Sequence, residues 1–407
     1  MKKTKIIINS STFQENDSDD VTDVINNLTD NLLKVNDSLE ITILKPMSKM
    51  GQRIIKKDNY KIHCYSYFWP KKYQLFHNTG IVPGLKLSKF NYLKLLFLFV
   101  SQFLNLLVLS IKLKPEYIYA HWVLPQALIS AFVCKILNIK LVFTTHGAEV
   151  LLINKLKFVN KLILNFITKN AYKFTANSEL TLSEITKNCK TKYIQDKYKI
   201  IPMGIKNEIF CSDKLKKTYT DNDFLYVGRL IDYKGVDILL DALSMLKDSN
   251  KENFKLEILG NGVDEEDLKK MVKKNDLVQN VNFNGFKNLD EKIKFYEHAS
   301  VTFVTSKISN QRLEGGPLTL IEAMAQKNIC IVSDSIGFKK YLNKNNCILF
   351  ESGNSKSLLK AIDCYTKMTK DEREDMGNKA YITSEFFKFQ NIAGIHNDFL
   401  FSDFINN

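Results

Sequence analysis

Residues 224–246 read FLYVGRLIDYKGVDILLDALSML. The apolar run Phe224–Val227 is typical of a buried strand, and the apolar spacing within Val236–Leu246 predicts a helix. Gly228 and Gly235 mark the turn between the two. A strand, a turn and a helix in this order form half of a βαβ unit, which is the building block of a parallel sheet.

The same alternation of apolar runs and helical patterns extends over the whole chain of 407 residues. Strands are expected at Lys5–Ile8, Ile41–Leu44, Ile62–Tyr67, Tyr117–His121, Leu141–Thr145, Phe174–Asn177, Phe224–Val227, Leu256–Leu259, Val281–Phe283, Val301–Thr305, Ile329–Ser333 and Ile348–Phe350. Helices are expected at Val21–Val35, Phe90–Ile111, Ala127–Leu137, Val236–Leu246, Glu265–Val272, Leu289–His298, Leu318–Ala325 and Ser355–Met368.

Two such series predict an α/β protein with two Rossmann-like, doubly wound parallel-sheet domains that face a central cleft. Pro202 and Gly204 mark the boundary between the two series of strands and helices. We therefore expect one domain at 1–204 and a second at 205–385. We also expect a C-terminal helix at about 386–407 that can return to pack on the first domain.

The net charge of +14 is concentrated in one part of the chain. Residues 45–205 contain 25 Lys and Arg but 6 Asp and Glu, a net charge of +19. Such a field attracts anionic lipid, phosphorylated substrates or nucleic acid. Arg53 is the single arginine of residues 1–205, and base-edge recognition depends on arginine. An anionic membrane surface is therefore the expected partner of residues 45–205, and nucleic acid is not expected.

One apolar run raises the same question of membrane contact. Leu95–Ile111 spans 17 residues without a charge, between Lys94 and Lys112. A membrane span needs about 20 apolar residues, and this run also contains four polar side chains. A buried or half-buried helix is favoured over a span, and a helix that touches the bilayer interface stays open.

The cysteines and the N-terminus favour a cytoplasmic protein. The seven cysteines are scattered and form no C-x-x-C pair, which is typical of reduced thiols and disfavours a structural zinc site. The first apolar run, Ile6–Ile8, is too short for a signal peptide and is expected to be a strand. We expect a location peripheral to the inner face of the plasma membrane.

Two motifs place charges at turns in the second domain. Arg229 and Lys234 flank the turn before a helix, where two cations suit a diphosphate. Residues 314–325 read EGGPLTLIEAMA, so glycines separate a loop carboxylate, Glu314, from a helical one, Glu322. Pro317 is expected in the first helical turn. Both carboxylates can then accept hydrogen bonds from sugar hydroxyls; the alternatives are solvated surface charges and a capped surface helix.

Three further motifs follow strands of the first domain. They read YAHW at 119–122, THGAE at 145–149 and ANSE at 176–179. A lone histidine is usually structural, but His121 and His146 end neighbouring expected strands, which makes a site plausible. Ser178 is placed to cap the next helix.

Taken in order, these motifs resemble the retaining glycosyltransferases of family 4, which have the GT-B fold. The resemblance also includes IPMGI at 201–205 and LGNG at 259–262, and it runs from about residue 60 to 385. Residues 67–83 resemble bacterial polysaccharide and exopolysaccharide members. The resemblance implies a metal-independent hexosyltransferase with no cofactor. It would move a sugar from a nucleotide-diphosphate donor to a lipid-linked or polysaccharide acceptor in cell-surface glycan synthesis.

The resemblance also implies roles for individual residues. Arg229 and Lys234 would hold the donor diphosphate, Glu322 the ribose hydroxyls and Glu314 the transferred sugar. His121 would lie beside the reacting face of the sugar, so that the catalytic set is His121, Glu314, Arg229 and Lys234. The other donor-binding positions would be Gly228, Gly260, Gly315, Gly316, Pro317 and Leu318.

Some features depart from the family pattern and leave alternatives open. The segment Asn9–Asp20 contains no glycine where members often have a glycine-rich loop near the acceptor. Asp17-Ser18-Asp19 spells a metal-binding D-x-D motif, although helix capping is favoured there. The alternatives are a nucleotide-sugar epimerase and a non-catalytic, membrane-associated homologue. The presence of Arg229, Lys234, Glu314 and Glu322 argues against the second.

Overall fold

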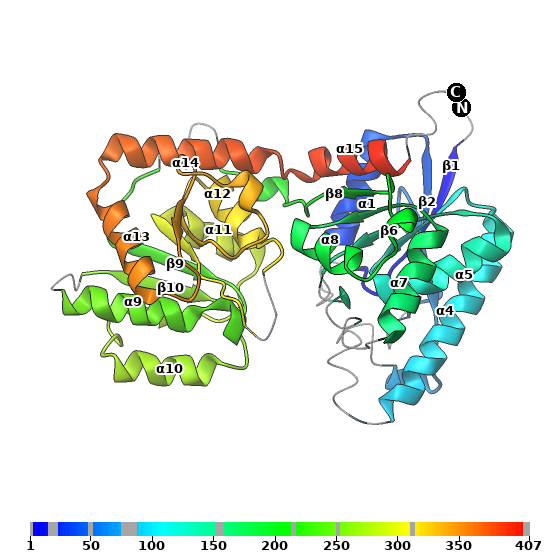
Figure 1. Cartoon of the computed structure of the whole chain (residues 1–407), viewed down its shortest axis with the longest axis horizontal. Coiled ribbons are helices and arrows are strands. Elements are labelled where there is room, and N and C mark those ends of the chain that lie inside the picture. Colours follow the sequence, from blue (N-terminus) through cyan, green and yellow to red (C-terminus); the bar gives the residue numbers. More distant parts are fainter. Residues whose placement is uncertain are drawn as a thin grey trace. The chain divides into compact units, whose positions relative to one another are not determined.

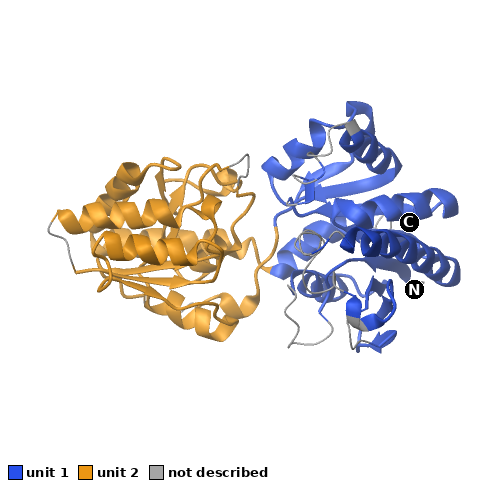
Figure 2. Ribbon diagram, turned by 90° about the horizontal axis from the view of Figure 1, so that it is seen from below, with its two compact units in different colours: residues 1–202, 389–407 blue, residues 203–388 orange. Residues whose placement is uncertain are grey.

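The computed structural model describes residues 3–14, 23–47, 52–74, 88, 90–147, 149–150, 153, 158–212, 217–249, 253–309 and 314–401. Unit 1 contains Met1–Pro202 and Phe389–Asn407, and unit 2 contains Met203–Lys388 (Figure 2). The boundary lies two residues before the expected position at 204. The C-terminal segment enters unit 1 at Phe389, slightly later than the expected 386. The D-x-D motif and residues 75–83 of the segment 67–83 lie outside the described residues.

Unit 1 is built on an eight-stranded sheet with the order β3-β4-β2-β1-β5-β6-β7-β8. Its strands are β1 (Thr4–Asn9), β2 (Leu39–Pro46), β3 (Ile54–Lys56), β4 (Lys61–Tyr65), β5 (Tyr117–His121), β6 (Lys140–Thr145), β7 (Ala171–Ala176) and β8 (Tyr198–Ile200). All pairs are parallel except the edge pair β3–β4, which is antiparallel. The predicted parallel sheet is therefore confirmed, with one antiparallel edge pair that was not predicted.

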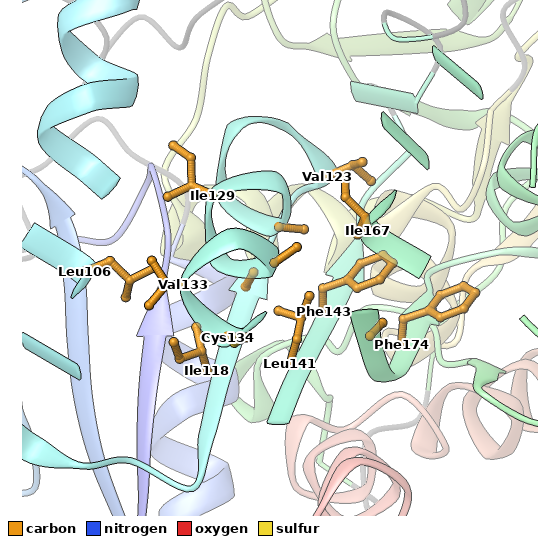
Figure 3. Packing of buried hydrophobic residues seen from close by; sticks show 14 of the residues in the cluster. Leu106, Ile118, Val123, Ile129, Val133, Cys134, Leu141, Phe143, Ile167 and Phe174 are labelled. Carbon is orange, nitrogen blue, oxygen red and sulfur yellow. The ribbon is translucent and has the colours of Figure 1, made fainter. Parts of the chain in front are cut away.

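Helices cover both faces of this sheet (Figure 1). They are α1 (Val24–Val35), α4 (Asn91–Leu113), α5 (Leu128–Leu137), α7 (Phe158–Asn170), α8 (Glu179–Thr186) and α15 (Phe389–Leu400). Because side chains alternate along a strand, the two faces have separate cores. One contains Ile118, Leu141 and Phe143 with α4, α5 and α7 (Figure 3), and the other contains residues of α1 and α15.

Helix α15 returns from the end of the chain to pack against α1. The Asn36 side chain after α1 donates a hydrogen bond of 2.8 Å to Oδ1 of Asn397 in α15. Phe389, Ala393 and Leu400 of α15 belong to the same core cluster as α1. The last helix is therefore an integral layer of unit 1.

Unit 2 has a six-stranded parallel sheet in the order β11-β10-β9-β12-β13-β14. Its strands are β9 (Asp223–Val227), β10 (Lys255–Leu259), β11 (Val281–Phe283), β12 (Val301–Val304), β13 (Ile329–Ser333) and β14 (Ile348–Phe350). Its helices are α9 (Val236–Asp248), α10 (Glu265–Lys274), α11 (Leu289–His298), α12 (Leu318–Ala325), α13 (Ser355–Lys367) and α14 (Lys370–Glu385). The predicted α/β class with two domains is confirmed.

Candidate functional site

Several predicted donor-site residues of unit 2 lie in turns at the carboxyl ends of neighbouring parallel strands. After β9 and β10 the backbones touch, because the Gly228 N–H donates to the Leu259 carbonyl at 2.9 Å. Gly260 has φ +129°, and a Cβ on it would lie 2.0 Å from the Gly228 carbonyl oxygen. Gly228 and Gly260 thus let two loops pack closely at this edge, which gives both predicted positions a structural function.

The turn after β9 is also fixed to the segment that follows β12. Gly235 has φ +67° and immediately precedes α9; a Cβ there would lie 2.1 Å from the Thr305 carbonyl oxygen. The Thr305 hydroxyl donates to the Lys234 carbonyl at 2.9 Å. Lys234 is therefore held in place by its own backbone, which leaves its side chain to be directed at the site.

Lys234 and Glu314 meet directly. The distance from Lys234 Nζ to Glu314 Oε2 is 2.5 Å, and the two side chains are 15% and 13% exposed. The Ser306 hydroxyl donates to the same carboxylate oxygen at 3.4 Å. Two motif residues 80 positions apart are thus brought together as a largely desolvated ion pair.

Arg229 lies on the same turn but remains exposed. Its Nη2 donates to the Tyr233 hydroxyl at 3.1 Å, and the Lys234 ammonium lies 5.8 Å from the centre of the Tyr233 ring. Tyr233 thus lies between the two cations. Burial and the nearby Glu314 carboxylate raise the pKa of Tyr226, the tyrosine below the turn, so it stays protonated.

The loop that carries Glu314 is clamped against the segment after β13. The Gly337 N–H donates to the Glu314 carbonyl at 2.8 Å. A Cβ on Gly316 would lie 2.3 Å from the ring of Phe338, which is buried. A Cβ on Gly337 would lie 2.0 Å from the Gly315 carbonyl oxygen, so Gly316 and Gly337 allow the close contact that positions Glu314.

Helix α12 begins at Leu318, and Pro317 is its N-cap residue, with φ −71° and ψ 110°. The expectation that Pro317 occupies the first helical turn is wrong by one position, because its extended ψ angle is not helical. Proline has no side-chain acceptor, so it cannot cap the N–H groups of the first turn. These N–H groups are the feature of α12 that suits an anion.

Glu322 has two partners that the sequence did not indicate. Lys292 Nζ lies 2.8 Å from both Glu322 carboxylate oxygens, and the Tyr296 hydroxyl donates to Oε2 at 3.0 Å. Burial and the Glu322 charge raise the pKa of Tyr296 well above its ordinary value. Both partners lie on α11, so one helix orients and neutralises the carboxylate of another.

Lys307 is a second residue that was not predicted. Its Nζ lies 2.6 Å from Asp237 Oδ2 and 3.1 Å from Asp232 Oδ1. Burial opposes its charge, but the hydrogen bonds from Lys307 to the two aspartates raise the Lys307 pKa overall. The segment after β12 is thereby tied to the turn containing Lys234. Its place directly after a strand is the one sequence signal that could have found it.

Unit 1 contains the histidine pair. His121 ends β5 and its Nδ1 lies 3.2 Å from Nε2 of His146, which follows β6. His121 is fully buried and its Nε2 has no hydrogen-bond partner, whereas His146 is half-buried. Trp122 packs beside His146 at 4.9 Å between ring centroids. The two histidines predicted as neighbours are therefore in contact.

Burial keeps these histidines neutral. It lowers the His121 pKa well below its ordinary value, with His146 and His396 adding repulsion. It also lowers the pKa of His146 to about 4 and that of His396 to about 3. His396 comes from α15 and lies 3.3 Å from the Tyr119 hydroxyl. Because it is 275 positions from His121 in the chain, no local pattern could have predicted that it joins the group.

Glu149 and Asn177 hold the loop that carries His146. Glu149 Oε1 accepts hydrogen bonds from the His146 N–H at 2.9 Å and from the Thr145 hydroxyl at 2.8 Å. The Asn177 side chain donates to the His146 carbonyl at 3.0 Å. Burial raises the Glu149 pKa although these hydrogen bonds oppose it. The predicted cap is confirmed: the Thr181 N–H donates to the Ser178 hydroxyl at 3.2 Å.

Metal ligands do not gather in the described part of the chain. Among those residues, no three His, Cys, Asp or Glu side chains are close enough to hold a metal ion. All seven cysteines are free thiols.

Comparison with known families assigns both units. The model "Glycosyl transferases group 1" matches residues 209–383, and "Glycosyl transferase 4-like" matches residues 47–178. The chain belongs to the glycosyltransferases that these two models describe. The first match lies in unit 2, with the Lys234–Glu314 pair, and the second lies in unit 1, with the histidines.

Relatives and solved structures agree with this family. An uncharacterised glycosyltransferase of Methanocaldococcus jannaschii is 26% identical over 61% of this glycosyltransferase chain and 64% of its own. The amylovoran biosynthesis glycosyltransferase AmsK of Erwinia amylovora is 27% identical over 52% and 51%. The matches thus span less than two thirds of either relative.

Among solved structures, HepE of Anabaena, in complex with UDP, has a TM-score of 0.69 at 15% identity, and the match covers 98% of this chain and 100% of that one. The fold is GT-B.

Proposed function

We propose that the protein is a retaining glycosyltransferase that uses a nucleotide-diphosphate sugar in bacterial polysaccharide synthesis. The Lys234–Glu314 ion pair, beside Arg229 and the starts of α9 and α12, carries this proposal. It offers cations for a diphosphate and a carboxylate for sugar hydroxyls within one small region. HepE was solved with UDP-glucose and AmsK is named for amylovoran biosynthesis, which supports the same class of donor and pathway here.

In the proposed reaction the bond between the sugar C1 and the diphosphate oxygen breaks, and its electron pair leaves with the nucleoside diphosphate. The acceptor hydroxyl forms the new bond to C1 on the same face. Its proton passes to the departing phosphate oxygen. Arg229, Lys234 and the N–H groups at the start of α12 stabilise the charge that develops on that oxygen, which is electrostatic catalysis. We propose that these cations replace a divalent metal.

Glu314 and Glu322 would bind different parts of the donor. When the diphosphate engages Lys234, Glu314 is released to accept hydrogen bonds from the transferred sugar. Glu322, held by Lys292 and Tyr296, would accept the ribose hydroxyls through its remaining lone pairs. The backbone around Gly228, Gly260 and Gly315–Leu318 would complete the donor site.

In unit 1 we propose that His121 acts at the reacting face of the sugar, either directly or through His146. His121 is wholly buried and hydrogen-bonded to the more exposed His146, so His146 can make the outer contact. The acceptor we propose is a lipid-linked or polysaccharide glycan.

A panel of nucleotide sugars tests the proposal. Nucleoside diphosphate release and sugar transfer to polyprenyl-diphosphate glycans would be followed with the full chain, with and without EDTA. The proposal requires product with the donor's anomeric configuration, seen by NMR, and no loss with EDTA. Inverted product would refute the retaining mechanism, and turnover retained by Glu314→Ala would refute the assignment of the site.

A further inference from the structure

Helix α4 carries large apolar side chains on its outer side as well as on its inner side, yet only the inner side is buried. Its inner side chains, including Leu98, Leu106 and Leu109, belong to the core of unit 1. Its outer side is a stripe of exposed large apolar residues: Leu93, Leu96, Phe97, Val100, Leu104, Val108 and Ile111, each 44–64% exposed. A helix on the surface of a soluble domain normally has a polar outer side. Within the described residues, α4 is also the one helix long and apolar enough to cross a membrane.

Helices α5 and α7 extend the exposed apolar surface. α4 packs against α5, and α5 packs against α7 (Figure 1). Phe132 and Ile136 of α5 are 45% and 61% exposed, and Val159 and Leu162 of α7 are 51% and 72% exposed. Phe132 contacts Phe166 of α7 with ring centroids 4.5 Å apart. We call these exposed residues of α4, α5 and α7 the three-helix face.

The charge around this face has one sign. The three helices contain no Asp or Glu, and they carry five lysines: Lys94, Lys112, Lys135, Lys161 and Lys169. Between Asp58 and Glu179 the sequence has 15 lysines and two acidic residues. One of these, Glu149, is buried. An exposed apolar surface edged by lysines is typical of a helix that lies in the interface of an anionic bilayer.

We propose that the three-helix face binds the surface of an anionic lipid bilayer, with its apolar side chains at the level of the lipid headgroups and its lysines against the phosphates. A second copy of the chain is a poorer occupant, because it would bring lysines against lysines with no carboxylate to pair them. A helix that crosses the bilayer is also excluded by the packing. The inner side of α4 is core, and Gln102 Nε2 donates to Asn9 Oδ1 of β1 at 2.8 Å.

Vesicle flotation of the full chain tests this binding. Vesicles of phosphatidylcholine alone are compared with vesicles that also contain phosphatidylglycerol, at low and high salt. The test variant is Val100→Asp with Leu104→Asp. Val278→Asp in unit 2 is the matched control, because Val278 is 52% exposed and Val100 is 49% exposed. A second variant replaces Lys112, Lys135 and Lys161 by Gln, with Lys356, Lys360 and Lys370 replaced by Gln as its control.

We expect flotation with the anionic vesicles only, and a fall with salt. Both test variants should lower the bound fraction by about tenfold or more, and both controls should float as the parent does. Equal binding to neutral vesicles, or equal flotation of test and control variants, would overturn the proposal. The proposal would also be overturned if sedimentation showed that Val100→Asp with Leu104→Asp dissociates a dimer while lipid binding stays unchanged. Flotation requires no turnover, so this result is independent of the proposed reaction.

Discussion

The two units have the same number of basic residues but use them differently. Unit 1 has 29 Lys and Arg against 16 Asp and Glu, a net charge of +13, whereas unit 2 has 29 against 28, a net charge of +1. In unit 2 the site lysines are paired: Lys234 with Glu314, Lys292 with Glu322 and Lys307 with Asp237. Unit 1 cannot neutralise its excess within itself. The comparison separates lysines that are held by carboxylates from lysines that contribute to a net positive field.

The histidines also differ between the two units, because unit 1 gathers buried histidines and unit 2 does not. His121, His146 and His396 are brought together in unit 1, with pKa values lowered by burial. Unit 2 has one histidine, His298, which is exposed. A fall in pH should therefore change the stability of unit 1, whereas a change in the charged residues of unit 2 should change ligand binding.

The largest effect is expected from the exposed cation of unit 2. Arg229→Ala should lower kcat by about 100-fold or more, as loss of one group that stabilises developing charge does elsewhere. The thermal unfolding midpoint should stay unchanged because Arg229 is exposed. Arg53→Ala, an exposed arginine of unit 1, is the control and should keep full turnover. Turnover by Arg229→Ala equal to the control would remove Arg229 from the mechanism.

Acid should destabilise unit 1. The unfolded chain protonates His146 below pH about 6.5, but the folded protein does so only near a pKa of about 4. Stability is therefore lost as the pH falls through this window, by about 3 kcal/mol for His146 alone. The raised pKa of Glu149 acts in the opposite direction.

Both tryptophans, Trp69 and Trp122, lie in unit 1, so thermal unfolding followed by tryptophan fluorescence reports on that unit. The midpoint should fall between pH 7 and pH 5. An equal midpoint at the two pH values would show that the buried histidines do not control stability. His298→Asn should leave the pH dependence as it is.

A smaller effect should follow when the Glu314 loop is displaced. Gly316→Ala puts a methyl group into the Phe338 ring, and overpacking of this kind costs about 1–3 kcal/mol. Turnover should fall with it, because Glu314 moves. Gly394→Ala in α15 is the matched control, since a Cβ there meets nothing within 4 Å. If the two variants are equally stable and equally active, the clamp between residues 314–316 and 336–338 is not required.

The smallest effect is expected from Lys292, and it distinguishes a role in donor binding from a role in catalysis. Lys292→Met leaves Glu322 without its partner cation, so KM for the donor should rise by about tenfold while kcat changes little. Lys294→Met, on the exposed side of the same helix, should behave as the parent in steady-state kinetics. A fall in kcat with KM unchanged would place Glu322 in the transition state and not in ribose binding.

Sequence patterns were sufficient for every strand except β3 and β8, because each of the other strands is a short apolar run between turns. They missed α7 and also α14, whose residues are mostly polar. The two missed edge strands, β3 and β8, are three residues long and bury little. They pointed to Lys234 and the histidine pair by their place after strands, and to Glu314 by the glycines that separate it from Glu322. They could not identify Lys292, Tyr296 or His396, since these act through contacts between distant segments.

The most direct test of the account is to measure nucleoside diphosphate affinity by calorimetry. The tightest ligand of a nucleoside diphosphate panel, with UDP as the first member, is titrated into the parent, Lys234→Ala and His121→Asn proteins. The account predicts that Lys234→Ala weakens binding by about tenfold or more, and that His121→Asn binds as the parent does. Unchanged affinity in Lys234→Ala, or an equal loss in both variants, would contradict the placement of the donor site in unit 2.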